Sequence, residues 1–333
     1  SRAASASRPH RRPRGKNRYS PDNQPMAHIY IYSPSGGVRD KAAFRRGVKR
    51  LQARGYEVEI DADALSSHQR FAGDDDTRLA AIGRAAASGA QVALISRGGY
   101  GLTRLLPRLP FAELQQAVER GTQFVGLSDF TALQLALLAQ NGTQTWAGPA
   151  LLADFGVPEE PDEIMQDCFD DLLVGQGEGT GWRLPLSDLR AHPGLSGEEG
   201  WGVEQAQLWG GNLSVLVSLL GTPYFPQIEG GILFLEDVAE HPYRIERMLT
   251  QLLHAGVLGR QQAVLLGQFN RYQLVPHDKG FKLQSVVDWL RSQLPVPVLT
   301  GLPFGHVPTK VLLPVGARLD LAVSGREAIL FWD

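Results

Sequence analysis

The sequence is poor in the features that mark extracellular and membrane proteins. Cys168 is the one cysteine among 333 residues, which excludes an intramolecular disulfide and an all-cysteine metal site. No run of apolar residues approaches the ~20 that a helix needs to span a bilayer. The basic N-terminus also lacks the apolar stretch of a secretory signal. We therefore expect a cytoplasmic protein that does not bind membranes.

Net charge is also small, but it is unevenly distributed. The chain carries 33 basic and 35 acidic residues, for a net charge of −2. Residues 1–25 hold seven of the basic residues and one acid, Asp22, so this segment is +6 and the rest of the chain is −8. A basic segment of this kind is typical of a nucleic-acid or membrane arm, or of a disordered leader upstream of a start at Met26. We expect a disordered leader and an acidic body that does not bind nucleic acid.

Short β-rich runs alternate with helical stretches from residue 26 to about residue 150. The apolar runs Gln91–Ser96 and Gln123–Leu127 are typical of strands buried on both faces of a parallel sheet. Strands that alternate with helices at this spacing predict βαβ units and a parallel, right-handed sheet. Ligands of such sheets bind beyond the carboxyl ends of the strands, which directs attention to the loops at 33–37, 96–101 and 128–129.

The remainder of the chain predicts a second domain after an irregular connection. Residues 151–205 contain several prolines and a glycine-rich stretch, as expected of a connection between domains. From residue 206 to residue 333 the regular pattern returns, with a buried strand at Gly231–Leu235 and an amphipathic helix at Tyr243–Ala255. The predicted organisation is thus a 26–150 α/β domain, a 151–205 connection and a 206–333 domain.

Ser128 is a candidate nucleophile because of its place between a strand and a helix. It lies in Gly126-Leu127-Ser128-Asp129, where a sharp turn would present its hydroxyl at the top of the sheet. The helix N-terminus behind it would favour developing negative charge. Phe130 stands where the G-x-S-x-G motif of α/β-hydrolases has its last glycine, and a serine here can equally cap the helix.

A serine nucleophile needs a base and a group that orients the base. Among the eight histidines, His306 lies in a stiff Pro-Phe-Gly-His-Val-Pro loop that would hold its ring in place. Glu236 and Asp237 follow a buried strand, and since neighbouring strand residues point to opposite sides, at most one can face the serine. A histidine bonded to backbone and a helix-capping acid remain alternative interpretations.

Glycine-rich turns supply candidate oxyanion donors. The segment Arg97-Gly98-Gly99-Tyr100-Gly101 follows a buried strand and could supply one N–H group, and Asp129 another. The segment is a poor phosphate loop, because no Lys-Ser/Thr pair follows the glycines. Gly210-Gly211-Asn212 could position substrate or only cap its helix.

Taken together, these segments resemble the LD-carboxypeptidases, serine peptidase family S66. The resemblance runs in chain order from about Ile29 to Leu321, and it departs from the family pattern at Ser96, where cysteine is often found, and at Leu127, where an aromatic residue is usual. It rests on six co-linear segments: Ser96–Gly101, Gly126–Leu133 with Gly148-Pro149, Gly210–Leu213, Gly221–Tyr224, Leu235–Val238 with Tyr243–Leu249, and Pro303–His306.

The resemblance implies a fold, a site and a reaction. The fold is a parallel, Rossmann- or flavodoxin-like α/β domain followed by a smaller C-terminal α/β domain of swivelling, β-barrel-like form. The triad is Ser128, His306 and Glu236, and the oxyanion donors are Gly99 and Asp129. The implied reaction removes terminal D-alanine from the L-centre of diaminopimelate in a murein tetrapeptide during peptidoglycan recycling. Neither a metal nor an organic cofactor is implied, and homodimers are frequent in the family.

Several points stay open at the level of sequence. The substrate's C-terminal carboxylate could be bound by Arg97, Arg104 or Asn212. A relative that hydrolyses peptidyl or acyl-sulfamoyl adenylates and gives microcin immunity would use the same triad, with Trp182 and Trp201 as candidate surfaces for adenine. A non-catalytic binding protein of periplasmic type is a further alternative, disfavoured by the lack of an export signal. An amidotransferase-like enzyme is excluded, since Cys168 does not lie at the strand-to-helix turn.

Overall fold

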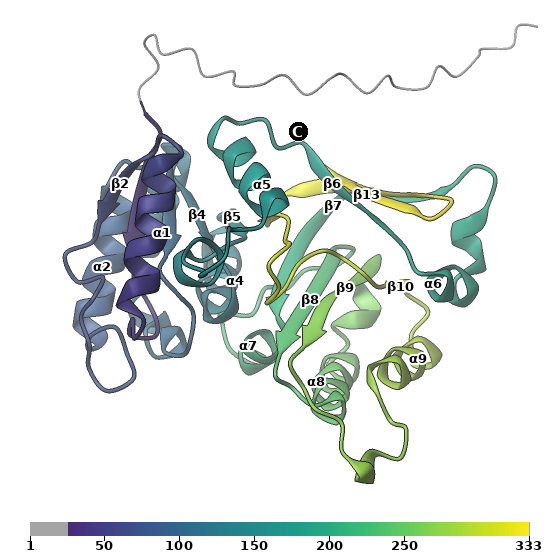
Figure 1. Ribbon diagram of the computed structural model, residues 1–333. Helices are drawn as coiled ribbons and strands as arrows, with labels where there is room; N and C mark the ends of the chain where they lie inside the picture. The colour runs from purple at the N-terminus through teal and green to yellow at the C-terminus, as the bar shows by residue number, and fades with distance from the viewer. Residues whose placement is uncertain (1–25, 333) are drawn as a thin grey trace, which may run out of the picture.

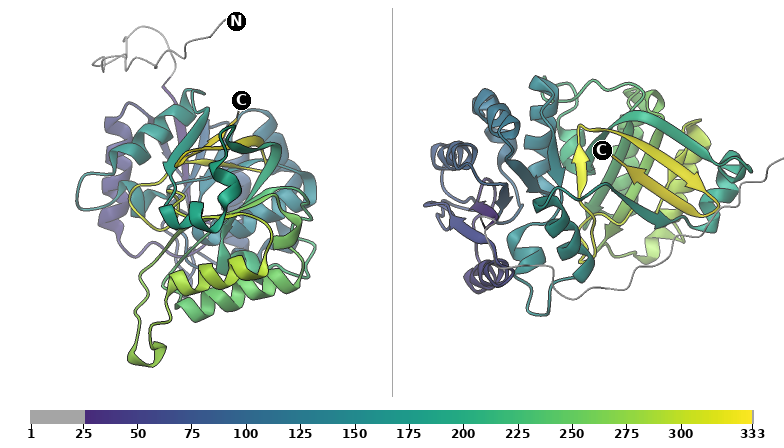
Figure 2. Two further views of the ribbon diagram at one scale, coloured as in Figure 1. Left: turned by 90° about the vertical axis from the view of Figure 1, so that its right-hand side faces the viewer. Right: turned by 90° about the horizontal axis from the view of Figure 1, so that it is seen from above.

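The structure is a computed structural model that describes residues 26–332. The basic leader expected over residues 1–25 lies outside the described residues. Two sheets lie side by side, each accompanied by its own helices, with α4 (Thr131–Asn141) and α7 (Leu213–Ser218) in the region between them (Figures 1 and 2). This arrangement confirms the predicted α/β class with a parallel first sheet.

The first sheet has six strands in the order β11-β5-β4-β3-β1-β2. Five of them pair in parallel, as the buried apolar runs predict, and β11 pairs antiparallel to β5. β11 comes from the far end of the chain, so the C-terminal part returns to complete this sheet. The strands are β1 (His28–Tyr32), β2 (Glu57–Ile60), β3 (Val92–Ile95), β4 (Gln123–Gly126), β5 (Thr145–Ala147) and β11 (Leu313–Val315).

Helices cover both faces of the first sheet because its strands alternate apolar residues to either side. On one face, Phe44, Val48 and Leu51 of α1 (Lys41–Ala53) join α5 (Glu163–Leu173) in packing on Ile29, Ile31 and their neighbours. The other face carries α2 (Asp75–Ala87), α3 (Phe111–Glu119) and α4 (Thr131–Asn141).

The second sheet has seven strands in the order β10-β9-β8-β7-β12-β13-β6. The half from β7 to β10 is parallel and the half from β7 to β6 is antiparallel. Over the described residues β10 and β6 form two free edges, so the sheet is open and does not close into the barrel-like form that was expected. The strands are β6 (Gly179–Arg183), β7 (Trp201–Asn212), β8 (Ile232–Val238), β9 (Ala263–Asn270), β10 (Val298–Leu299), β12 (Arg318–Ser324) and β13 (Glu327–Phe331).

The stretch expected as an irregular connection contains regular structure. Residues 151–205 form α5, β6, α6 (Leu186–Ala191) and the start of β7. β6 is an edge strand with mostly exposed residues, so the apolar alternation that reveals a half-buried strand is missing from its sequence. Its pairing with β13, far along the chain, is what orders it.

One continuous apolar core extends from the first sheet into the second. It runs from Ile95 and Phe124 through α4 to Trp209 and Phe234, and α4 contacts both β7 and α7 (Leu213–Ser218). The remaining helices, α8 (Pro242–His254) and α9 (Leu283–Gln293), add their buried faces to the same core. The two sheets are therefore joined by packed side chains and not only by the chain.

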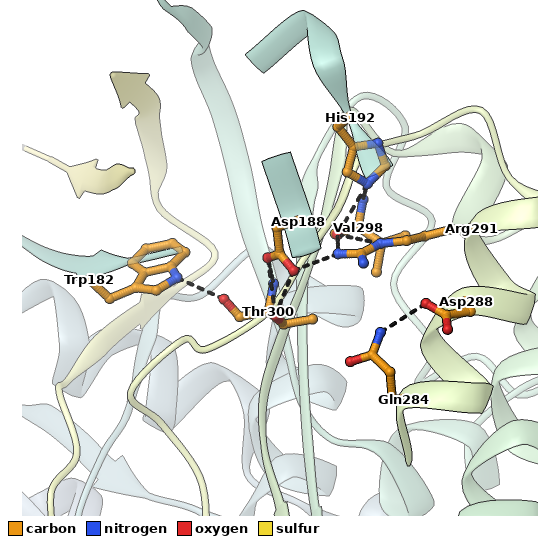
Figure 3. A network of polar contacts seen from close by, with 8 residues as sticks. All are labelled: Trp182, Asp188, His192, Gln284, Asp288, Arg291, Val298 and Thr300. Carbon is orange, nitrogen blue, oxygen red and sulfur yellow. Dashed lines mark hydrogen bonds and ion pairs between the residues drawn. The ribbon is translucent and has the colours of Figure 1, made fainter. Parts of the chain in front are cut away.

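A buried polar network fixes α6 to the edge of the second sheet (Figure 3). Asp188 pairs with Arg291 of α9 at 2.8 Å and accepts the backbone N–H of Thr300 at 2.6 Å. His192 contacts the backbone of Val298 in β10, with Nε2 3.1 Å from its nitrogen. These bonds satisfy backbone groups at an edge that has no further strand.

Within residues 26–332, none of the helices combines the length and apolar character needed to cross a bilayer. The same part of the chain contains no group of three or more histidine, cysteine and acidic side chains placed to hold a metal ion.

Candidate active site

Three loops meet at the carboxyl edge of the first sheet, as the strand order predicts. Ser33 and Ser96, at the ends of β1 and β3, are joined by a hydrogen bond between their Oγ atoms at 2.5 Å. Gly36 donates its backbone N–H to the carbonyl of Gly98 at 3.0 Å. The loops after β1 and β3 therefore lie against each other next to the turn that follows β4.

Ser128 occupies that turn in an unusual backbone conformation. It begins a short 3-10 turn ahead of α4, with φ at +67°, in the left-handed region. A non-glycine residue held there costs of order 1–3 kcal/mol, and such strain clusters at functional sites. Gly98 faces it so closely that a Cβ at residue 98 would lie 2.9 Å from Ser128 Oγ. Ser128 is partly exposed, as the predicted strand-to-helix turn requires.

His306 and Glu236 come together in the second sheet. His306 Nδ1 lies 2.7 Å from Glu236 Oε2, with the carboxylate side chain 1% exposed and the imidazole 19% exposed. If Nδ1 donates this bond, Nε2 is left with a free lone pair to accept a proton. Asn270 holds the backbone of this histidine, donating from Nδ2 to the His306 carbonyl at 3.0 Å.

Asn212 connects this pair to the turn that carries Ser128. Its Nδ2 contacts Glu236 Oε1 at 3.3 Å, and its backbone N–H donates to Thr131 Oγ1 at 3.1 Å. Thr131 begins α4, three residues after Ser128. The approach is close enough that a Cβ on Gly211 would meet Thr131 Oγ1 at 2.7 Å, so the end of β7 is pressed against the start of α4.

The three predicted triad residues thus lie on elements in mutual contact. Within residues 26–332, however, no hydrogen bond joins Ser128 Oγ to His306. Hydrogen bonds between a catalytic nucleophile and its base are often long until substrate binds. The structure brings His306 and Glu236 together directly, and it links Ser128 to them through Thr131 and Asn212.

Asp237, the other candidate acid, faces a different partner. Its carboxylate accepts the Asn212 amide at 3.0 Å and the Ser214 N–H at 2.9 Å, at the start of α7. Burial, together with the neighbouring charge of Glu236, raises the pKa of Asp237 to about 6. Of the two consecutive acids, only Glu236 contacts the imidazole.

Two backbone N–H groups near Ser128 remain unpaired in the described part of the chain. Gly99, with φ at +107°, and Asp129 donate to no protein acceptor there. The Asp129 side chain is buried and accepts bonds from Ser35 Oγ at 2.7 Å and from the Leu102 N–H at 3.0 Å. Burial raises the pKa of that carboxyl. The side chain of Asp129 therefore holds the turn in place, while its backbone N–H remains free to bind a ligand.

Arg97 lies beside these donors without an acidic partner among the described side chains. Its guanidinium packs against Gly36 and Gly99 and donates to the Gly37 carbonyl at 3.0 Å. Burial lowers the pKa of Arg97, and the positive charges of Arg39 and Arg70 lower it further. Three cationic groups therefore gather at the edge of the candidate site.

The other two candidates for binding a carboxylate are already engaged. Arg104 pairs with Asp75 at 3.1 Å and stacks over the Phe71 ring at 5.0 Å. Asn212 is 4% exposed, with its amide nitrogen on the two acids and its oxygen accepting the Val215 N–H at 3.1 Å. This geometry favours a positioning role for Asn212 and leaves Arg97 as the candidate for substrate.

Comparison with known proteins gives the family. The LD-carboxypeptidase N-terminal domain matches residues 29–148, and the LD-carboxypeptidase C-terminal domain matches residues 205–321. The chain belongs to the LD-carboxypeptidase family.

Similar proteins support a serine-type carboxypeptidase. The crystal structure of muramoyltetrapeptide carboxypeptidase from Oxalobacter formigenes is 38% identical, with a TM-score of 0.79 over 92% of this chain and 99% of that one. A putative carboxypeptidase of Synechocystis is 33% identical over 90% of this chain and 92% of its own. The microcin C7 self-immunity protein of Escherichia coli is 25% identical over 66% and 68%. The family therefore includes more than one kind of hydrolase.

Sequence reasoning missed the residues that hold this LD-carboxypeptidase site together. Thr131 and Asn270 act through single bonds to backbone groups, and such bonds leave no spacing pattern in a sequence. Of the two aromatic residues considered for adenine, Trp182 is not a free surface, because it is 7% exposed and donates Nε1 to the Thr300 carbonyl at 3.0 Å, whereas Trp201 is partly exposed.

Proposed function

We propose that this LD-carboxypeptidase hydrolyses the amide bond between meso-diaminopimelate and the terminal D-alanine of murein tetrapeptides, with Ser128 as nucleophile. The observation that carries the proposal is the His306–Glu236 hydrogen bond, tied through Asn212 to the turn that presents Ser128. The muramoyltetrapeptide carboxypeptidase of Oxalobacter formigenes supports the choice of substrate. Peptidoglycan recycling in the cytoplasm, by a homodimer, is part of the same proposal.

In the proposed mechanism, neutral His306 takes the proton of Ser128 Oγ as the hydroxyl attacks the amide carbonyl. The negatively charged oxygen of the tetrahedral intermediate accepts the N–H groups of Gly99 and Asp129. His306 then gives its proton to the leaving amine of D-alanine, and Ser128 is left acylated. In the second half of the reaction water attacks this acyl-enzyme, with His306 again taking and returning the proton, and Ser128 is set free. Glu236 keeps the imidazole in the tautomer that can accept this proton and stabilises the imidazolium.

Carboxypeptidase action also requires a site for the substrate's terminal carboxylate. We assign it to Arg97, whose guanidinium lies against Gly99 and has no acidic partner in the described chain. A planar guanidinium can bind a carboxylate through two parallel hydrogen bonds. Arg39 and Arg70 add positive charge around it, which favours an anionic group at this place.

Replacing the nucleophile tests the proposal. We expect Ser128→Ala to lower turnover of L-Ala-γ-D-Glu-meso-diaminopimelyl-D-Ala by several orders of magnitude and to leave the fold intact. Mass spectrometry of the peptide, before and after incubation with each protein, measures the loss of one alanine. Circular dichroism of the two proteins is the control for folding. Release of D-alanine at a near-normal rate by Ser128→Ala would rule out the assignment.

The microcin-immunity alternative is testable with the same protein. It is supported by the similarity to the microcin C7 self-immunity protein, and it would use the same triad on a peptidyl adenylate. Of the two tryptophans considered for adenine, Trp182 is buried and Trp201 is partly exposed, so the preference for the murein peptide rests on the similarity to the muramoyltetrapeptide carboxypeptidase. A higher kcat/KM for a peptidyl adenylate than for the murein tetrapeptide would reverse this preference.

A further inference from the structure

A buried ion pair lies close to the base in sequence and has no part in the proposed mechanism. Lys310 Nζ is 2.8 Å from Asp154 Oδ1, and both side chains are 2% exposed. Lys310 follows His306 by four residues. Asp154 belongs to a different part of the chain, after β5 of the first sheet.

Asp154 is held rigidly at the first sheet. It lies in a π-helical turn, Leu151–Phe155, and its carboxylate also accepts the Ala150 N–H at 2.8 Å. Leu152 in the same turn donates its backbone N–H to the Ser96 carbonyl at 3.0 Å, at the end of β3. π-Helical turns are rare in proteins, and those that occur are often found at functional sites. The turn is thus bonded to the edge of the sheet that carries Arg97 and Ser128.

Two arginines of α1 fix the far side of this turn. Arg46 Nε donates to the Gly156 carbonyl at 2.9 Å, and Arg50 Nη1 to the Phe155 carbonyl at 2.9 Å. Cations at the C-terminal end of a helical turn satisfy carbonyls that have no partner within it. Asp154 is therefore a fixed point and not a mobile surface acid.

Lys310 and His306 lie on the same segment, which connects β10 of the second sheet to β11 of the first. Asn270 of β9 binds the His306 carbonyl at one end of this segment, and β11 begins at Leu313 beyond the other end. Thr309 Oγ1 donates to Asp162 at 2.5 Å. Lys310 fastens the middle of the segment to the π-helical turn, so the loop of the base is bonded to both sheets.

The chemistry of the pair indicates a role in positioning. A buried ion pair stabilises a fold little more than apolar side chains of similar size, but it fixes two segments at one distance and direction. Burial raises the pKa of Asp154, while Lys310, then the Ala150 N–H, then the charge of His306 lower it.

We infer that the Lys310–Asp154 pair positions His306 against Ser128 by bonding the loop of the base to the first sheet, an inference that rests on the proposed triad. Ser128 lies in the turn after β4 of the first sheet, and His306 lies in a loop bonded to Glu236 of β8 in the second; the pair joins this loop to the first sheet within four residues of the base. Both are positioning residues, since neither contacts the reacting atoms.

The test compares two buried ion pairs. Lys310→Met removes the cation of this pair, and Arg291→Met removes the cation of the Arg291–Asp188 pair, whose side chains are 7% and 1% exposed. We expect both variants to melt at lower temperature than the wild type, because each leaves a buried acid without its partner. Only Lys310→Met should lower kcat, by about 100-fold, the effect of a small misplacement of a catalytic group. Its KM should stay within about threefold of the wild-type value.

A neutral double variant separates positioning from folding. In Lys310→Met/Asp154→Leu no buried charge is left unpaired, so we expect a melting temperature close to that of the wild type with kcat still reduced. Wild-type kcat in this variant, wild-type kcat in Lys310→Met, or an equal loss of kcat in Arg291→Met would each overturn the inference. Failure of the wild-type protein itself to release D-alanine would count against the proposed function instead.

Discussion

Glu236 shows how strongly one residue's environment determines its role. It is fully buried, accepts a hydrogen bond from the Asn212 amide and contacts His306, whereas Asp237 beside it binds the start of α7. Residue spacing alone leaves the two adjacent acids equivalent, and the choice of Glu236 in the sequence came from the family resemblance; in the structure Glu236 is the acid that contacts His306. A register shift in the pairing of β8 with β9, between Leu235 and Asp237, lies at this point in the structure.

Glu236→Gln tests the assignment of the orienting acid. An amide in place of the carboxylate cannot stabilise the imidazolium and permits the wrong tautomer, so we expect kcat to fall by about 10⁴-fold. Steady-state kinetics on the murein tetrapeptide measure this, with Asp237→Asn as the matched control. The control should lose far less activity, because Asp237 does not contact the imidazole. Equal losses in the two variants would contradict the assignment of Glu236.

Arg97→Met tests recognition of the substrate carboxylate. Losing a charge-assisted hydrogen bond should lower kcat/KM by about 10- to 100-fold for the free tetrapeptide. The same peptide with a C-terminal amide has no terminal carboxylate for Arg97 to bind, so the wild type and the variant should hydrolyse it at the same low rate. Arg104→Met is the control, because that guanidinium already pairs with Asp75. An unchanged preference for the free acid in Arg97→Met would show that another group binds it.

At the scale of elements, the short edge strand β10 depends on side chains of α6 and α9. His192 and Asp188 bind the backbone of Val298 and Thr300, and Arg291 donates from Nη2 to the Val298 carbonyl at 2.6 Å (Figure 3). Burial lowers the pKa of His192, and the positive charge of Arg291 lowers it further. The folded protein therefore favours the neutral imidazole, which makes the attachment of α6 sensitive to pH.

His192 should make stability fall in mild acid. Its pKa is lower in the folded chain than the ~6.5 of an unfolded chain, so between these two values the unfolded state binds more protons. The contribution of His192 is complete above about pH 6.5 and is lost as the pH falls toward the lowered pKa. Urea unfolding of wild type and His192→Gln between pH 8 and pH 5 measures it. The difference in unfolding free energy between the two proteins should change across this range, and a constant difference would contradict the prediction.

The elements that the sequence predicts best are those whose signal is local. The strands expected at Gln91–Ser96 and Gln123–Leu127 are observed at Val92–Ile95 and Gln123–Gly126, and the helix expected at Tyr243–Ala255 is observed at Pro242–His254. β6 and α5 were missed in a stretch that was expected to be irregular. β6 is defined by its partner β13, and α5 by the face of the first sheet that it covers.

At the scale of the whole molecule, the two sheets share one core. The apolar cluster is continuous through α4 and α7, and β11 returns from the C-terminal part to pair with β5. Because both halves of the chain depend on the same buried contacts, we expect the two halves to unfold together. The active-site candidates lie where these halves meet, so their geometry depends on the intact molecule.

A single cooperative unfolding transition follows from this shared core. We expect urea unfolding curves from far-ultraviolet circular dichroism and from tryptophan fluorescence to superimpose. The fluorescence includes Trp146 of the first sheet and Trp209 of the second, both buried. Hydrogen exchange of Val92–Ile95 and Ile232–Leu235, one strand from each sheet, should report the same free energy of opening. Two separate transitions would mean that the sheets unfold independently.

The sequence by itself determined the α/β class, most of the strands and helices, and the loops at which a site should lie. Strand and helix periods are properties of neighbouring residues, and the carboxyl ends of parallel strands meet at one edge whatever the details of packing. The contact of Glu236, and not Asp237, with His306 was implied by family resemblance but is visible only in the tertiary structure, which alone decided that β11 completes the first sheet and that Lys310 pairs with Asp154. These contacts join residues 70, 156 and more than 160 positions apart, and no local pattern encodes which distant partner a side chain will meet.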